Sequence, residues 1–147
     1  MLQLLVFVVG VVGMGWLIGA TNPPGDWYAG LAKPGFVPPN WAFPVAWTIF
    51  YVMIAIAGWR TFRRDPSGKA MLAWAMQLAL NFAWSPVMFT MHQIGAALAI
   101  LICLFVAIVT YIGLELSRDR LAAALFVPYA AWVGFAGVLN AAIWRLN

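Results

Sequence analysis

Charged residues are scarce in this sequence. Lys, Arg, Asp and Glu make up 8% of its 147 residues, whereas 65% are hydrophobic and the mean hydropathy is +0.93. An ordinary soluble domain has about 25% charged residues. A soluble fold of roughly 150 residues still exposes about a third of its chain surface to water, and this chain has too few polar residues to cover such a surface. The composition therefore predicts an integral membrane protein, with a single domain over residues 1–147.

Side chains that could act as acids, bases or metal ligands are also few. The candidates are Asp26, Asp65, Glu115, Asp119, His92 and Cys103. A zinc or di-iron site needs three or four ligands, and no such set occurs at ligand spacing. There is no glycine-rich phosphate loop. We therefore expect no metal site, no required cofactor, and no hydrolytic or ATP-driven chemistry.

Two of these residues have a simple structural interpretation. His92 falls in a short turn and is interpreted as a solvated loop histidine rather than a haem ligand. Glu115 ends a hydrophobic run near Arg118, so we expect an interfacial ion pair between these two. Cys103 is the only cysteine, so no intrachain disulfide can form.

Long hydrophobic runs are what the sequence has in abundance. Five of them approach the ~20 residues that a helix needs to cross a bilayer. They cover residues 2–20, 44–62, 70–91, 94–116 and 121–144. None alternates as a membrane β-strand would. The first run lacks Lys and Arg, so we expect it to be retained as a helix and not cleaved as a signal peptide. The predicted fold is an all-α bundle of five transmembrane helices.

The basic residues are distributed unevenly between the two ends of this predicted bundle. One end collects Arg60, Arg63, Arg64, Lys69, Arg118 and Arg120, and the other has Lys33 and Arg145. The positive-inside rule then places the N-terminus in the cytoplasm and the C-terminus outside. The net charge of +4 thus reflects topology and does not indicate a nucleic-acid partner. Short loops and the lack of an Arg-rich transit segment favour a bacterial cell membrane.

The segment between the first two runs, residues 21–43, is rich in aromatic residues and proline. The stretch from Trp27 to Trp47, which overlaps this segment, has four prolines and a single charge, on Lys33. Proline fixes φ and glycine permits tight turns, so this segment should fold into a defined structure. We expect it to form an extramembrane lid over a cavity between the helices.

The third run has two distinct faces. Gln77, Asn81, Trp84 and Met88 recur at helical spacing, and polar side chains within a span face the bundle interior or a cavity. A ridge of small residues lies roughly opposite, formed by Ala75, Ala79 and Ala83. Such a ridge permits close helix packing. It is either a contact within one chain or a homodimer interface.

Of the nine tryptophans, Trp27 lies in the predicted lid and the other eight divide into two groups. Those near span ends are interpreted as interfacial anchors; they are Trp16, Trp41, Trp59, Trp74 and Trp144. The others, Trp47, Trp84 and Trp132, lie deeper or share a face with small or polar residues. We expect them to converge under the lid as flat aromatic walls, which suit a planar apolar ligand.

Several segments of the chain resemble one known family. WYAGLAKPGFVPPNW, FPVAW, QLALNFAWSP and LFVPYAAWVGFAGVLN occur in this order between Trp27 and Asn140. Together they are similar to the translocator proteins, also called tryptophan-rich sensory proteins. The resemblance implies a five-helix membrane protein, often a homodimer, that binds porphyrins such as protoporphyrin IX or haem, and sterol-like molecules, under its first loop.

The resemblance also implies which residues bind the ligand. They are Trp27, Tyr28, Pro34, Phe43, Pro44, Trp47, Asn81, Trp84, Trp132, Ala136 and Leu139. In some bacterial members the tryptophans matching Trp47 and Trp132 are linked to light- and oxygen-dependent porphyrin breakdown. The C-terminal sterol motif of animal members is incomplete here, because Ala141 and Ala142 stand where it requires a tyrosine.

Three functions remain open at this point. The first is a membrane receptor or sensor that binds porphyrins and aids their transport or turnover. The second is an enzyme that degrades the bound porphyrin by means of tryptophans. The third is a scaffold whose dimer contact matters more than any ligand; the lid argues against it, because a scaffold has no need of one.

Overall fold

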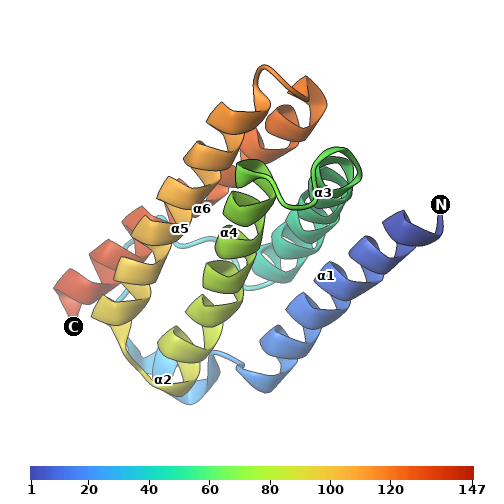
Figure 1. Ribbon diagram of the computed structural model, residues 1–147. Coiled ribbons are helices and arrows are strands. Elements are labelled where there is room, and N and C mark those ends of the chain that lie inside the picture. The colour runs from blue at the N-terminus through green and yellow to red at the C-terminus, as the bar shows by residue number, and fades with distance from the viewer.

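The computed structural model describes all residues from Met1 to Asn147, and every regular element in it is helical (Figure 1). The elements are α1 (Leu2–Thr21), α2 (Gly25–Gly30), α3 (Ala42–Arg64), α4 (Lys69–Ser85), η1 (Pro86–Thr90), α5 (Ile94–Glu115) and α6 (Arg120–Leu146). Four of the five predicted hydrophobic runs form one long helix each, with ends close to the expected ones. The prediction of an all-helical bundle is confirmed.

Four of the helices, α1, α3, α5 and α6, are long and apolar enough to cross a membrane. The third predicted span is divided instead. Pro86 has no backbone N–H to donate, so one α-helical hydrogen bond is missing at this position. The chain widens there into the π-helical turn η1, in which the backbone N–H of Met91 donates to the carbonyl of Pro86 at 2.9 Å.

The helices pack side by side in an order that differs from the chain order. α1 packs on α3, α3 on α6, and α5 lies between α6 and α4 (Figure 1). The core contains fully buried large side chains from several helices, among them Ile54, Tyr111, Phe126 and Tyr129. α1 is the least buried of the four helices that are long enough to span a membrane.

Trp74 corrects one expectation from the sequence. It was interpreted as an interfacial anchor, but it is only 7% exposed and packs against α3. Its indole N–H donates to the carbonyl of Ile54 at 2.9 Å, and its ring lies over Gly58. A tryptophan near the end of a span can therefore serve as a helix-packing residue when a glycine faces it.

The arginine-rich end of the bundle is held together by ion pairs. Arg60 on α3 pairs with Asp119 at 2.8 Å, and Arg64 pairs with Glu115 at 2.5 Å. Glu115 has no exposed surface, and it also accepts a hydrogen bond from Thr61 at 3.1 Å. The expected pairing of Glu115 with Arg118 is thus wrong. The carboxylate is buried inside the bundle because α3 supplies a closer cation, whereas Arg118 lies 3.9 Å from Asp65.

Asp119 has a second role at this end. It is the N-cap of α6, and its side chain accepts hydrogen bonds from the backbone N–H groups of Leu121 and Ala122, both at 3.1 Å. Burial alone would raise the pKa of this carboxyl. The hydrogen bond from Arg60, the N-cap bond from Ala122 and the charges of Arg60 and Arg64 outweigh that effect and hold the pKa below its ordinary value.

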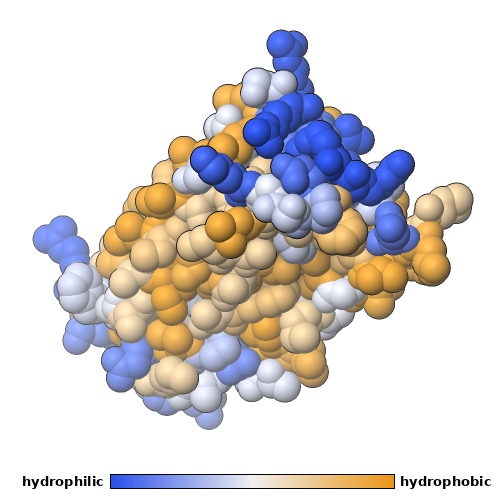
Figure 2. Space-filling view, viewed as in Figure 1, coloured by the Kyte–Doolittle hydropathy of each residue, from blue (hydrophilic) through white to orange (hydrophobic).

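The surface is apolar around the middle of the bundle and polar at its ends (Figure 2). Hydrophilic side chains gather most densely over the α3–α4 and α5–α6 turns, where the arginines lie. α2, the α4–α5 turn and the C-terminus lie together at the opposite end (Figure 1). An apolar band between two polar ends is the surface expected of a protein in a bilayer.

Candidate functional site

A cavity of about 920 Å³ lies at the end of the bundle that carries α2. It is enclosed by the C-terminal part of α1, the N-terminal part of α3, α4 with η1, the C-terminal half of α6, and the loop that contains α2. Ligand pockets in proteins typically have volumes of about 300–1,000 Å³. The cavity is therefore large enough for a sizeable organic molecule.

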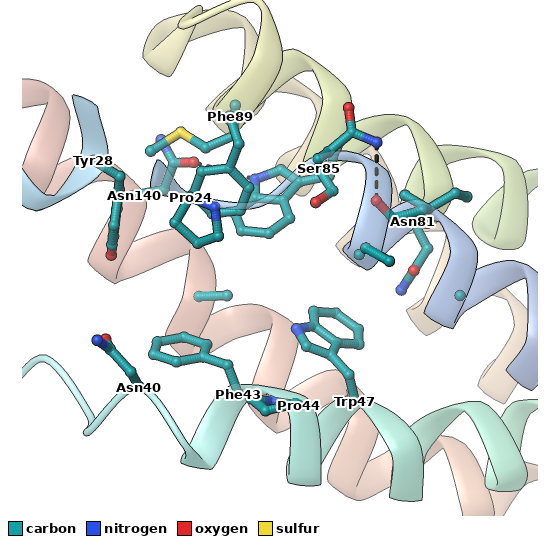
Figure 3. A pocket seen from close by; sticks show the side chains of 18 of the residues that line it. Pro24, Tyr28, Asn40, Phe43, Pro44, Trp47, Asn81, Ser85, Phe89 and Asn140 are labelled. Atoms are coloured by element: carbon teal, nitrogen blue, oxygen red, sulfur yellow. Dashed lines mark hydrogen bonds between the residues drawn. The ribbon is translucent and has the colours of Figure 1, made fainter. Parts of the chain in front are cut away.

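One wall of the cavity is aromatic and comes from α3. Phe43 and Trp47 project from this helix, and the Trp47 ring stacks on Tyr51 with a centroid distance of 5.7 Å. Figure 3 shows Phe43 and Trp47 across the cavity from Pro24 and Phe89. The two walls present flat apolar surfaces to each other.

The opposite aromatic wall depends on η1. Phe89 makes edge-to-face contacts with Tyr28 of α2 and with Trp84 of α4, each with a centroid distance of 5.3 Å. The wide turn after Pro86 places Met88 and Phe89 on the cavity wall. Pro86 thus contributes to the site through the backbone, although it does not line the cavity itself.

A chain of hydrogen bonds runs from the cavity into the core. Tyr51 donates to Asn81 Oδ1 at 3.1 Å, Asn81 Nδ2 donates to the Tyr129 hydroxyl at 2.7 Å, and Tyr129 donates to Gln77 Oε1 at 3.0 Å. Tyr51 and Asn81 line the cavity, whereas Gln77 and Tyr129 are fully buried behind them. Both polar groups of the Asn81 side chain and the Gln77 Oε1 atom thus have partners, as most buried polar groups do, whereas the buried Gln77 Nε2 has none.

A second set of hydrogen bonds joins α4, α6 and α5. Trp84 Nε1 donates to Asn140 Oδ1 at 3.2 Å, and Asn140 Nδ2 donates to the carbonyl of Ile94 at 2.9 Å. Trp84 and Asn140 both line the cavity, so these bonds fix the orientation of the indole toward it. The arrangement supplies apolar surface with a few fixed polar groups, which suits ligand binding better than bond-making chemistry.

The lid loop is tied to the bundle at several further places besides the contact of Tyr28 with Phe89. Thr90 donates to Asn22 Oδ1, and the Trp27 ring stacks on His92 with a centroid distance of 4.1 Å. The Asn147 side chain also both donates to and accepts from the backbone of Ala32, each bond being 3.0 Å long. The loop therefore has a defined structure over the cavity, as its proline and aromatic content predicts.

Comparison with known proteins identifies the family. The sequence profile of the TspO/MBR family matches residues 4–145. The chain belongs to this family. It is 38% identical to Protein CrtK of Rhodobacter capsulatus, over 88% of this chain and 83% of that protein. It is also 38% identical to the tryptophan-rich sensory protein of Cereibacter sphaeroides, over 88% of this chain and 82% of the relative.

The TspO/MBR family also includes relatives in animals. The human translocator protein is 32% identical, over 91% of this chain and 84% of its own length. The resemblance inferred from the sequence motifs is thus confirmed. With four helices able to span a membrane, this TspO/MBR protein is an integral, multi-pass membrane protein.

Most of the ligand-binding residues expected from the TspO/MBR resemblance lie around the one cavity. The lining includes Tyr28, Phe43, Pro44, Trp47, Asn81, Trp84, Ala136 and Leu139. On α3, Trp47 shares one helical face with Tyr51, Ile54 and Gly58, and the last three of these are buried. Helical spacing and the family motifs together thus located three of the helices that form the cavity.

Trp27, Pro34 and Trp132 are not among the residues that line it. Trp27 lies on the lid against His92. Trp132 packs behind the α3 wall, with ring centroids 6.0 Å from Phe43 and 6.5 Å from Trp47. It borders a shallow apolar depression on the outside of the bundle instead, together with Pro38, Phe50, Pro128, Ala131 and Phe135.

Sequence reasoning missed the contribution of α1. Gly15, Trp16, Ile18, Gly19 and Ala20 all line the cavity. Gly15 approaches Tyr51 so closely that a Cβ would lie 2.2 Å from its ring. The glycines of α1 were the available signal, because a small residue on a helix permits such an approach. Asn22 and Asn140 were also missed.

The small-residue ridge of α4 lies on the outside of the bundle. Ala75 and Ala79 are exposed and Ala83 is half-buried. The alternative in which all three pack within one chain therefore does not describe this structure.

Metal-binding side chains do not gather anywhere in the molecule. No three His, Cys, Asp or Glu residues lie close enough together to hold an ion. His92 is exposed, and its contact is the Trp27 ring.

Proposed function

We propose that this TspO/MBR protein is a membrane receptor that binds a porphyrin, such as protoporphyrin IX or haem, in the cavity beneath the lid. The observation that carries the proposal is the cavity itself, about 920 Å³ in volume with aromatic walls from α3 on one side and from α2, α4 and η1 on the other. Related planar or sterol-like molecules are the runner-up ligands. Binding would serve sensing, transport or turnover of the ligand.

The shape of the walls favours a flat ligand. Phe43 and Trp47 face Pro24 and Phe89 across the cavity (Figure 3), so a planar ring system can contact apolar surface on both sides. Aromatic contacts of this kind contribute about 0.5–1.5 kcal/mol each beyond area burial. The amides of Asn81 and Asn140 supply the few polar groups that fix a ligand's orientation.

The proposal includes five spans and a defined orientation. α4 and η1 together run from Lys69 to Thr90, close to the ~20 residues that a bilayer needs. With α4–η1 as the third of five spans, the arginine-rich end faces the cytoplasm together with the N-terminus. The lid and the C-terminus then lie outside, in a bacterial cell membrane.

The receptor is further proposed to be a homodimer through the outer ridge of α4. Ala75 and Ala79 are exposed there, and small residues permit close approach of a second helix. Substituting Ala79 by Leu should then shift the protein from dimer to monomer in light scattering of the detergent-solubilised protein. Unchanged mass in that variant would exclude this interface.

Filling the cavity tests the proposed function. Ala136→Phe places a large side chain on the cavity wall and should weaken protoporphyrin IX binding about tenfold, equivalent to 1.4 kcal/mol. Affinity is measured from the shift of the porphyrin Soret band, which does not depend on the number of tryptophans. Ala124→Phe is the matched control, because Ala124 is exposed on the same helix away from the cavity. Equal binding by the two variants would contradict the proposed site.

A porphyrin-degrading enzyme is the second candidate, favoured by one observation. Trp47 lines the cavity and touches Trp132 behind it, at a centroid distance of 6.5 Å, so the two indoles could act together. Under light and oxygen, product should then form with the wild-type protein and fail to form with Trp47→Phe or Trp132→Phe. Porphyrin loss at the same rate without protein would eliminate this function.

A further inference from the structure

We propose that Lys33 forms an anion-binding subsite on the lid side of the cavity, and that the ligand carries a carboxylate that pairs with it. This inference rests on the proposed function and specifies the ligand further. The ligand would be an amphiphile whose acidic end lies under the lid, while its apolar body lies between the aromatic walls.

The first observation is the charge of the cavity. Lys33 is the only charged residue among those that line it. Three of the four acidic residues lie at the opposite end of the bundle, each within reach of an arginine. The fourth, Asp26, is exposed on α2, does not line the cavity and forms no ion pair. The cavity therefore presents a positive charge that no side chain of the protein neutralises.

The second observation is that the Lys33 ammonium is held in place. Its Nζ donates to the carbonyls of Ala29 at 3.0 Å and Leu31 at 3.1 Å, and it lies 4.8 Å from the centre of the Tyr28 ring. A lysine ammonium has three N–H donors, so one remains for a ligand. A flexible lysine side chain loses conformational entropy when a ligand fixes it. These contacts already order the Lys33 side chain, so ligand binding should cost less of that entropy.

The third observation is the distribution of polar groups along the cavity. Tyr28 and Asn40 lie at one end of it, and Asn81 lies at the other (Figure 3). The Tyr28 hydroxyl is neutral near pH 7, as an ordinary tyrosine is, and can donate to an acceptor on the ligand; burial raises its pKa further. The lid end thus offers a cation and neutral polar groups, whereas Asn81 and its partners are uncharged.

A ligand without a negative charge would leave Lys33 half-buried and still without a counter-ion. Enclosing a charge under a ligand without pairing it costs free energy, whereas a charge-assisted hydrogen bond to a carboxylate is among the stronger ones in proteins. The cavity should therefore discriminate between an acid and its neutral ester even when the two have the same ring system.

The experiment compares protoporphyrin IX, which carries two carboxylates, with its dimethyl ester. Both dissociation constants are measured from the Soret shift with the detergent-solubilised full chain. In the wild-type protein the ester should bind about tenfold more weakly, equivalent to 1.4 kcal/mol. Lys33→Met should abolish this preference by weakening the acid alone, and Lys33→Arg should retain most of it.

Lys69→Met is the matched control. It removes the only other lysine, at the far end of the bundle, so a preference that persists in this variant and is lost in Lys33→Met does not come from the overall positive charge of the protein. If the wild-type protein binds ester and acid equally, or if Lys33→Met weakens both alike, the anion subsite is overturned while porphyrin binding stands. If neither porphyrin binds the wild-type protein, the proposed function fails, and the subsite with it.

Discussion

Asp119 joins three structural roles in one side chain. It caps α6, pairs with Arg60 at 2.8 Å and lies 3.4 Å from Arg64. Its carboxyl has a lowered pKa in the folded protein. An ordinary aspartate in the unfolded chain takes up its proton near pH 4. Below about pH 4 the unfolded chain therefore binds more protons than the folded protein. The stabilisation that Asp119 provides is therefore complete above that pH and is lost as the pH falls toward the lowered pKa.

Asp119→Asn should lower the free energy of unfolding at pH 7 by about 2 kcal/mol, because charge-assisted hydrogen bonds are lost while the N-cap is kept. The melting temperature of the variant in detergent should also fall less between pH 6 and pH 3 than that of the wild type. Asp26→Asn is the control, since Asp26 is exposed and has no ion pair. A pH profile that is the same for all three proteins would refute the role of Asp119.

Single residues also mark where sequence reasoning ends. The interpretation of Glu115 failed because its partner, Arg64, lies 51 positions away in the chain, and local spacing cannot report such a contact. The family motif correctly named Trp47 as a wall of the cavity. Neither the motif nor helical spacing could show that Trp132 lies behind that wall. Spacing predicts which face of α6 points inward, but not which side chain of another helix each residue contacts.

At the scale of the helices, the contact between α3 and α4 depends on a glycine. A Cβ on Gly58 would lie 2.2 Å from the Trp74 ring, and the hydrogen bond from Trp74 to Ile54 leaves that ring little freedom to move. Gly58→Ala should therefore destabilise the protein by about 1–3 kcal/mol through overpacking.

The control for this substitution is Gly113→Ala on α5, where nothing lies within 4 Å of the added Cβ. There the better helix propensity of alanine should raise the free energy of unfolding by up to about 1 kcal/mol. Thermal unfolding in detergent, followed by circular dichroism, compares the two variants. Similar melting temperatures for both would show that the close contact at Gly58 has no energetic weight.

The helices themselves could be predicted well from hydropathy, because a run of apolar residues bounded by polar turns has few alternatives in a bilayer. The expected run 121–144 became α6 (Arg120–Leu146), for example. The π-helical turn after Pro86 was not predicted. Proline indicates that a helix is disturbed but not whether the chain kinks, stops or widens, since tertiary contacts such as those of Phe89 decide between these outcomes.

For the whole molecule, the orientation in the membrane can be tested directly. In a Cys103→Ala background, Gly35→Cys on the lid should react with a membrane-impermeant maleimide added to intact cells. Ser67→Cys, in the turn between α3 and α4, should react only after the cells are lysed, because the arginine-rich end is expected in the cytoplasm. The opposite labelling pattern would invert the proposed topology.

The two ends of the bundle are fastened by different forces. Buried and half-buried ion pairs hold α3, α5 and α6 together at the arginine-rich end. At the other end neutral contacts, such as the bonds between Asn147 and Ala32, secure the lid. Local opening should then occur mainly at the lid, while the arginine-rich end stays closed, since regions held by fewer and weaker contacts open first. A ligand could enter and leave the cavity past the lid while the ion pairs hold the helices together at the opposite end.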